Sequence, residues 1–195
     1  MSRGTKARGR ASQLRIIGGQ WRGRKLSFRP VAGLRPTTDR VRETLFNWLA
    51  PDIHAARCLD LFAGSGVLGL EALSRGAASC DFVERDAATL GQVENHLATL
   101  DARDRGHCHR IGAINFLEQA ADRWDIVFID PPFGQGLVGP SCALLGAKQQ
   151  VTDNGLVYIE TGASEALPSL PPGWELHREK KAGDVCYRLF VVRSA

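Results

Sequence analysis

Three acidic side chains stand where apolar, strand-like runs of this sequence end. Asp60 ends CLD and is followed by LFAGSG, Glu84 ends CDFVE, and Asp130 lies between VFI and PPF. In an open parallel sheet, ligands bind beyond the carboxyl ends of the strands. We therefore expect these three carboxylates to meet at one edge of a sheet and to bind polar groups of a ligand there.

The turn after Asp60 narrows the kind of ligand. Gly64 and Gly66 permit positive φ and a close approach of the backbone, and the absence of a following GK[ST] excludes a P-loop. The Asp60 carboxylate would repel a pyrophosphate but favours a cationic amino-acid or sulfonium group. Glu84 follows twenty-four residues later, a spacing typical of an acid that grips ribose hydroxyls. The combination favours S-adenosylmethionine over NAD.

The segment around Asp130 predicts a site for a flat ring that carries an amine. Pro131 and Pro132 have no backbone N–H, so the turn offers carbonyl oxygens, and Pro132 holds Pro131 in an extended conformation. Asp130 can accept one hydrogen of the amine and the Pro131 carbonyl the other, while Phe133 offers a face for stacking. These residues alone do not distinguish adenine from guanine.

The charge is divided unevenly along the chain. Residues 1–42 contain twelve Lys and Arg residues and one acid, Asp39, a formal charge of +11. The rest contains thirteen bases and twenty acids, which gives −7. A basic arm on an acidic body favours a polyanionic partner, with nucleic acid the first candidate. The arm also places arginines beside Trp21, a combination that suits RNA, where guanidinium groups meet phosphates and rings stack on bases.

The five scattered cysteines show no CxxC spacing, so we expect structural thiols in a reducing cytoplasm and no metal site. No apolar stretch approaches the length of a membrane span. We also expect no signal peptide.

The hydrophobic pattern predicts an α/β protein. A β-hairpin is expected over 14–28 around Gly18-Gly19, then a helix over 40–49 capped by Thr38 or Asp39, with Trp48 in the core. Strands are predicted at 56–62, 79–84, 108–111, 125–130 and 155–160, helices at 66–76, 87–100 and within 136–149, and an antiparallel pair over 174–193. This order indicates a Rossmann-like, mostly parallel sheet with helices on both faces.

Four stretches in this order carry a family resemblance: RIIGGQWRGRKL, LRPTTDRVRETLFNWL, CLDLFAGSGVLGLEALSRGA and VFIDPPF. Together they resemble the RsmD-type 16S ribosomal RNA guanine-N2 methyltransferases, over about residues 14–162. DLFAGSG and DPPF are shared with many methyltransferases, DNA adenine enzymes included, whereas the basic hairpin and the following helix are more specific. The resemblance implies a seven-stranded class I fold, S-adenosylmethionine as cofactor and a guanine of 16S rRNA as substrate.

The resemblance also implies site residues. The cofactor would contact Asp60, Phe62, Gly64, Gly66, Glu84, Arg85, Gly112, Ala113 and Asp130. The target base would meet Asp130, Pro131 and Phe133, and the RNA would meet Arg22, Arg24, Lys25, Arg35 and Thr37. Gly112 departs from the family, which usually has Asp or Asn there, so the adenine amine would need backbone or water contacts.

The expected organisation is a disordered basic tail (1–12), a hairpin-and-helix extension for RNA docking (13–50) and an S-adenosylmethionine-binding domain (51–195). The expected substrate is 16S rRNA within a 30S subunit or an assembly intermediate, and the protein is expected to be a monomer. Two alternatives stay open: an N6-adenine DNA methyltransferase, and a non-catalytic RNA-binding assembly factor.

Overall fold

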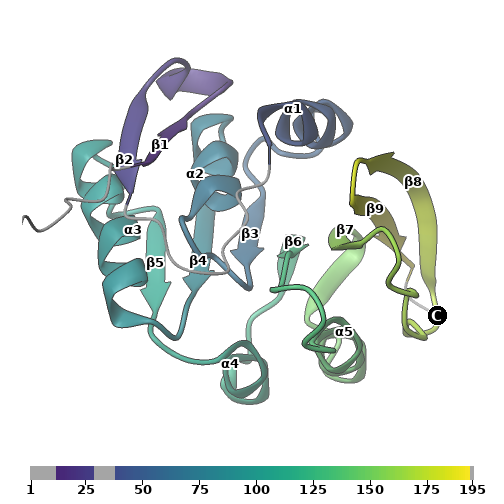
Figure 1. Ribbon diagram of the computed structural model, residues 1–195. Helices are drawn as coiled ribbons and strands as arrows, with labels where there is room; N and C mark the ends of the chain where they lie inside the picture. The colour runs from purple at the N-terminus through teal and green to yellow at the C-terminus, as the bar shows by residue number, and fades with distance from the viewer. Residues whose placement is uncertain (1–11, 29–37, 194–195) are drawn as a thin grey trace, which may run out of the picture.

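The computed structural model describes residues 12–28 and 38–193 and places helices on both faces of a seven-stranded sheet (Figure 1). The strand order is β5-β4-β3-β6-β7-β9-β8; β3 to β7 are parallel, and β9 runs antiparallel to both β7 and β8. The strands are β3 (Arg57–Asp60), β4 (Ser79–Val83), β5 (Gly106–His109), β6 (Trp124–Ile129), β7 (Val151–Gly162), β8 (Trp174–Ala182) and β9 (Val185–Val192). The Rossmann-like, mostly parallel fold class predicted from the sequence is confirmed.

Two hydrophobic cores lie on opposite faces of the sheet. Phe128 and Tyr158 face the helices α1 (Asp39–Trp48), α2 (Val67–Ser74) and α3 (Ala87–Thr99). Val127 and Ile159 face α4 (Ala113–Gln119) and α5 (Val138–Ala147). Because the central strands are covered on both faces, they are apolar without alternation. The short helix α4 was not predicted, since seven residues give too little periodicity to recognise.

The N-terminal hairpin forms, but its glycines do not make a tight turn. Strands β1 (Ser12–Arg15) and β2 (Lys25–Phe28) pair antiparallel, and the loop between them includes a 3₁₀ turn at Gly19–Trp21. A Cβ on Gly18 would lie 2.3 Å from the Arg75 guanidinium, and one on Gly19 would lie 1.9 Å from the Ser74 carbonyl oxygen. The two glycines therefore allow the loop to pack against the end of α2.

Trp21 belongs to this packing, so the expectation of an aromatic ring available to RNA bases is wrong for this residue. Its ring is buried, and the guanidinium carbon of Arg105 lies 5.3 Å from the ring centroid. The backbone N–H of Trp21 donates to Ser74 Oγ at 3.0 Å, and the Ser74 hydroxyl donates to the Gly18 carbonyl at 2.6 Å. Trp21 fastens the hairpin to α2.

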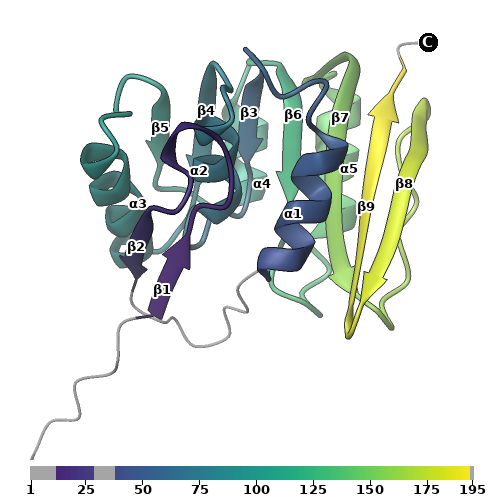
Figure 2. The ribbon, with the colours of Figure 1, turned by 90° about the horizontal axis from the view of Figure 1, so that it is seen from above.

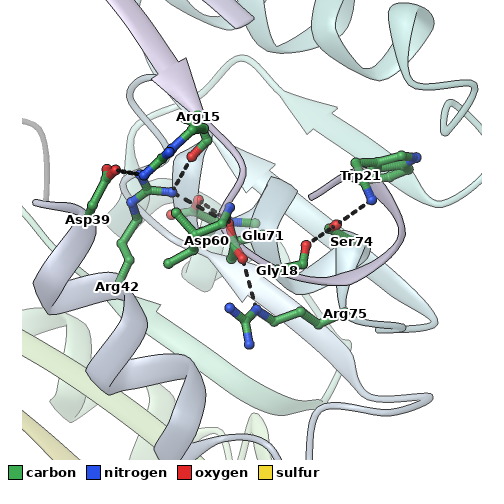
Figure 3. Close-up of polar contacts among 11 residues, drawn as sticks. Arg15, Gly18, Trp21, Asp39, Arg42, Asp60, Glu71, Ser74 and Arg75 are labelled. Carbon is green, nitrogen blue, oxygen red and sulfur yellow. Dashed lines mark hydrogen bonds and ion pairs between the residues drawn. The ribbon is translucent and has the colours of Figure 1, made fainter. Parts of the chain in front are cut away.

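A buried carboxylate joins the hairpin, α1 and α2 (Figure 3). Glu71 is fully buried and accepts hydrogen bonds from the Ile17 N–H at 3.0 Å and Arg75 Nε at 2.8 Å. The buried Arg42 of α1 lies 3.5 Å from the same carboxylate and donates to the Arg15 carbonyl at 3.0 Å. A charge removed from water must be compensated by such partners, so these three segments hold one another in place.

Helix α1 begins as predicted, because Thr38 Oγ1 accepts the Val41 N–H at 3.3 Å. Trp48 packs against the core and stacks on Tyr187, with the ring centroids 5.4 Å apart, so its predicted core role is confirmed.

All five cysteines are free thiols. Within residues 12–28 and 38–193, no helix has both the length and the apolar character to cross a membrane. The predicted tail lies outside these residues apart from Ser12.

We predict that Glu71→Ala lowers the free energy of unfolding by about 3–5 kcal/mol, because it leaves the part-buried Ile17 N–H without its acceptor and removes the carboxylate that pairs with Arg42 and Arg75. Urea denaturation measures the loss. The control is Asp122→Ala, which removes an exposed partner of Arg57 and should cost about 0.5 kcal/mol or less. Equal losses for the two variants would contradict the role assigned to Glu71.

Candidate active site

A cavity of about 700 Å³ lies at the carboxyl ends of the parallel strands. Its volume is within the range of about 300–1,000 Å³ typical of ligand sites. The structure brings ten of the predicted site residues to its lining: Asp60, Phe62, Gly64, Glu84, Arg85, Gly112, Ala113, Asp130, Pro131 and Phe133. The three strand-end acids recognised in the sequence thus meet at one site.

Gly66 is the predicted cofactor residue that does not line this cavity. It precedes α2 in a left-handed conformation with φ of 75°. A Cβ there would lie 3.0 Å from the Val93 side chain of α3. Gly66 therefore shapes the turn and the packing of two helices.

Asp60 lies at the floor of the cavity. It is 2% exposed, and one of its oxygens accepts the Gly69 N–H from α2 at 3.0 Å. Burial, with a smaller contribution from the Glu84 charge, raises the pKa of Asp60 to about 7. A cationic ligand group beside this carboxyl would favour its charged form.

Glu84 organises the two loops that border the cavity. One carboxylate oxygen accepts the Gly64 N–H at 3.2 Å and the other accepts the Asp86 N–H at 2.8 Å. Asp86 in turn caps α3 by accepting the Thr89 N–H at 2.8 Å. A carboxylate can accept about four hydrogen bonds, so these contacts leave it capacity to bind ribose hydroxyls as well.

The segment after β6 forms the opposite wall. Pro131 is buried, whereas Phe133 is 38% exposed at the cavity. The following Gly134 has φ of 73°, and its N–H donates to Glu165 at 2.5 Å. The other Glu165 oxygen accepts the Gly162 N–H at 2.8 Å. Glu165 thus ties the Phe133 loop to the end of β7, a role that no pattern in the sequence indicates.

Glu160 is a fourth strand-end acid in the cavity that the sequence reasoning missed. It is 5% exposed and accepts the Tyr158 hydroxyl at 2.8 Å. Burial, followed by the charges of Glu160 and Asp130, raises the pKa of Tyr158 well above its usual value. The signal was present, because GLVYIE ends in an acid just as CLD and VFID do.

The departure at Gly112 has a structural counterpart. A Cβ at Gly112 would meet nothing within 4 Å, so a side chain would fit there. One turn into α4, Asn115 lines the cavity. Its amide can donate and accept hydrogen bonds, so a polar side chain is available at this end of the cavity.

The predicted RNA-contacting residues lie away from the cavity. Arg22, Arg24 and Lys25 are exposed, and Arg22 and Arg24 belong to the loop that packs on the carboxyl end of α2. Figure 2 shows this loop over α2. The cavity lies at the other end of that eight-residue helix, about 12 Å away. Arg35 and Thr37 lie outside the described residues.

No group of His, Cys, Asp and Glu side chains suited to a metal ion occurs among the residues that the structure describes.

The fold and the cavity define a Rossmann-like methyltransferase. At the level of fold, the chain is similar to a structure described as the Thermus thermophilus 16S rRNA N2 G1207 methyltransferase (RsmC) in complex with AdoMet and guanosine. The TM-score is 0.66 and the identity 20%, over 94% of this chain and 50% of that one.

The chain belongs to the family described as conserved hypothetical protein 95, whose model matches residues 14–191. It is 53% identical to the Escherichia coli (strain K12) protein named Ribosomal RNA small subunit methyltransferase D, over 92% of this chain and 90% of that protein. The solved structure of a putative methyltransferase, yhhF, from Escherichia coli has a TM-score of 0.87 and 50% identity, covering 94% of this chain and 100% of that chain. The resemblance to RsmD-type enzymes is confirmed.

We predict that the stability difference between Asp60→Asn and wild type depends on pH. Folded Asp60 holds its proton up to about pH 7, whereas the unfolded carboxyl loses it near pH 4. Wild-type stability due to this group therefore falls as pH rises from 4 to 7, by roughly 4 kcal/mol at most. Asparagine does not titrate and keeps an oxygen for the Gly69 N–H.

Urea unfolding between pH 4.5 and 8 measures this difference, which should grow in favour of Asp60→Asn as pH rises. Asp122→Asn changes an exposed aspartate and should give a flat difference. A flat difference for Asp60→Asn as well would show that Asp60 is not buried in the way described.

Proposed function

We propose that this protein transfers a methyl group from S-adenosylmethionine to the exocyclic N2 of a guanine in 16S rRNA. One observation carries the proposal: Asp60 and Glu84 share a cavity with the Asp130–Phe133 segment. One wall thus suits a cationic nucleoside cofactor and the other an aromatic amine. Membership of a family with a 53% identical relative named as a small-subunit rRNA methyltransferase supports the choice of RNA.

The residues of the cavity fit S-adenosylmethionine by charge and shape. The buried Asp60 carboxyl, with its pKa raised to about 7, gains a counter-ion when a cationic group enters. Glu84 retains hydrogen-bonding capacity for the ribose, and Phe62, Arg85 and Ala113 border the same volume. A structure of the same fold, described as a complex with AdoMet and guanosine, supports such a double occupancy.

When bound, S-adenosylmethionine supplies the methyl group. The methyl–sulfur bond breaks as the bond to N2 forms, and the electron pair of the broken bond stays on sulfur. Guanine N2 is a poor nucleophile because its lone pair is delocalised into the ring. Asp130 and the Pro131 carbonyl accept its two hydrogens and align the lone pair, while Phe133 stacks on the ring, so the rate comes largely from positioning. The Asp130 carboxylate stabilises the positive charge that develops on N2, and Asp130 or water takes the released proton.

The target base must leave its stack to reach this cavity. The exposed Arg22, Arg24 and Lys25 then hold phosphates of the RNA without reading its sequence. Because the loop of Arg22 and Arg24 lies one helix length from the cavity, it suits a folded RNA that extends beyond the target nucleotide. Arg35 and Thr37 are proposed to extend this surface. The reaction would take place in the cytoplasm, on a 30S subunit or an assembly intermediate, with the enzyme a monomer.

The first prediction of this scheme is that the wild-type protein transfers tritium from labelled S-adenosylmethionine to undermethylated 30S particles and not to duplex DNA. Asp130→Asn should lower the rate at saturating cofactor roughly 100-fold, because it removes the charge beside the amine. Asp122→Asn, on the exposed surface, should keep full activity. Mass spectrometry of the rRNA then identifies the methylated guanine.

Each alternative has its own outcome in this experiment. Transfer to DNA would establish an adenine enzyme, and failure to bind S-adenosylmethionine would leave an RNA-binding assembly factor. An Asp130→Asn protein as fast as wild type would contradict the mechanism.

The second prediction concerns the salt dependence of RNA binding. Each phosphate contact contributes about 0.7–0.9 to the slope of log affinity against log salt concentration. Replacing both Arg22 and Arg24 with Gln should therefore flatten the slope by about 1.5. The matched control replaces Arg57 and Arg193, two exposed arginines paired with Asp122 and Glu175. If the hairpin variant keeps the wild-type slope, the hairpin is not the docking surface.

A further inference from the structure

Asp130 and Glu160 occupy equivalent positions on neighbouring strands. Strands β6 and β7 are parallel and pair Phe128 with Tyr158 and Ile129 with Ile159. Asp130 directly follows β6, Glu160 follows Ile159 within β7, and both line the cavity. Neighbouring strands lie about 4.8 Å apart, and side chains in register project to the same face. Both carboxyl groups thus border the cavity near the Tyr158 hydroxyl, whose pKa their charges help to raise.

A hydrogen bond from Tyr158 orients the side chain of Glu160. Its buried hydroxyl donates to Glu160 Oε2 at 2.8 Å, and the contact lies on the same face because the two residues are two apart on one strand. This bond uses one of about four acceptor positions of the carboxylate. Burial and neighbouring charges keep the tyrosine protonated, so its hydroxyl is the donor in this bond and Glu160 is the acceptor.

On the basis of the proposed function, we propose that Glu160 selects guanine by accepting the hydrogen of its ring nitrogen N1. With the exocyclic amine held by Asp130, the neighbouring ring atom on the Watson–Crick edge is N1 in both guanine and adenine. In guanine, N1 carries a hydrogen that a carboxylate accepts. In adenine, N1 is an unprotonated acceptor, so a carboxylate would face a lone pair.

The hydrogen bond between Glu160 and N1 distinguishes guanine from adenine, which the Asp130–Phe133 segment alone cannot do. An amine and a stacking ring are common to both purines, whereas the donor–donor pattern of N1 and N2 belongs to guanine. A site built for a hydrogen bond discriminates strongly against an analogue that lacks it, because its buried polar group is then left unpaired. Glu160 is thus a specificity-determining residue that touches the substrate.

The test compares guanine with 2-aminopurine, which keeps the amine at position 2 but has no hydrogen on N1. The 16S rRNA is assembled from ligated segments so that the mapped guanine can be replaced by 2-aminopurine. Tritium transfer to both RNAs is measured in reconstituted particles. Wild type should prefer guanine roughly 10- to 100-fold, the effect of one charged hydrogen bond.

In Glu160→Gln this preference should shrink to within about threefold, because a carboxamide can turn its N–H towards the bare N1 of 2-aminopurine. The intrinsic difference in nucleophilicity between the two bases affects both enzymes and cancels in the comparison. Glu175→Gln, the same change on exposed strand β8, should keep the wild-type preference. Thermal melting and calorimetry with S-adenosylmethionine verify that each variant is folded and binds cofactor.

Three results would overturn the inference: equal wild-type rates on both bases, an undiminished preference in Glu160→Gln, or loss of preference in Glu175→Gln. If Glu160→Gln does not fold, Glu160→Asp is tested in its place. Its shorter side chain holds the carboxylate farther from N1, so guanine methylation should slow more than 2-aminopurine methylation. An unchanged preference in that variant would also reject the role of Glu160. Failure of the proposed function is distinct, because the wild type would then methylate neither RNA.

Discussion

The burial of the Glu71 carboxylate is the constraint on which the arrangement of this protein depends. A charge with no access to water must be matched by donors, and these come from three segments: Ile17 of the hairpin loop, Arg42 of α1, and Arg75 at the end of α2. All eight residues of α2 are buried. Its first turn borders the cavity, and its last turn receives Trp21. One short helix therefore relates the hairpin to the active-site edge.

Charges are segregated in a way that suits a substrate with an acidic backbone and a neutral base. The cavity is lined by five carboxyl groups, Asp60, Glu84, Asp86, Asp130 and Glu160, and by one arginine, Arg85, whereas the exposed arginines of the hairpin lie away from it. Phosphates are attracted to the hairpin and repelled from the cavity. A base that offers N–H groups has the opposite preference. The electrostatics alone thus favour an orientation in which a base enters and the backbone stays outside.

The fold and three of the four strand-end acids could be predicted from the sequence, because they follow from local pattern. Apolar runs ending in Asp60, Glu84 and Asp130 give both the strands and the edge at which their side chains meet. Helix α4 escaped because seven residues show little periodicity. Glu160 escaped because, unlike Glu84, it has no telling spacing from the Asp60 turn and, unlike Asp130, no proline motif follows it. Glu165 could not be found at all, since its role depends on a contact thirty-one residues away along the chain.

The hairpin shows a different limit of sequence reasoning. The composition of the loop, with Gly18, Gly19 and Trp21, suggests a tight turn and a base-stacking ring. These three residues instead pack against Ser74 and Arg75, more than fifty residues later in the chain. The glycines and the tryptophan do mark a site of close contact, but the contact is with helix α2 of the same protein.

This changes where recognition of the substrate must be located. Phosphate contacts position a nucleic acid, and contacts to base edges specify it. With Trp21 buried, the described hairpin offers exposed charges that could position RNA, but the Trp21 ring is not available to read a base. In the proposed function, discrimination among purines would then fall to the hydrogen-bonding groups that line the cavity. In the proposed function, the basic arm would determine which region of a large RNA is presented, and Asp130 and Glu160 would determine which base reacts.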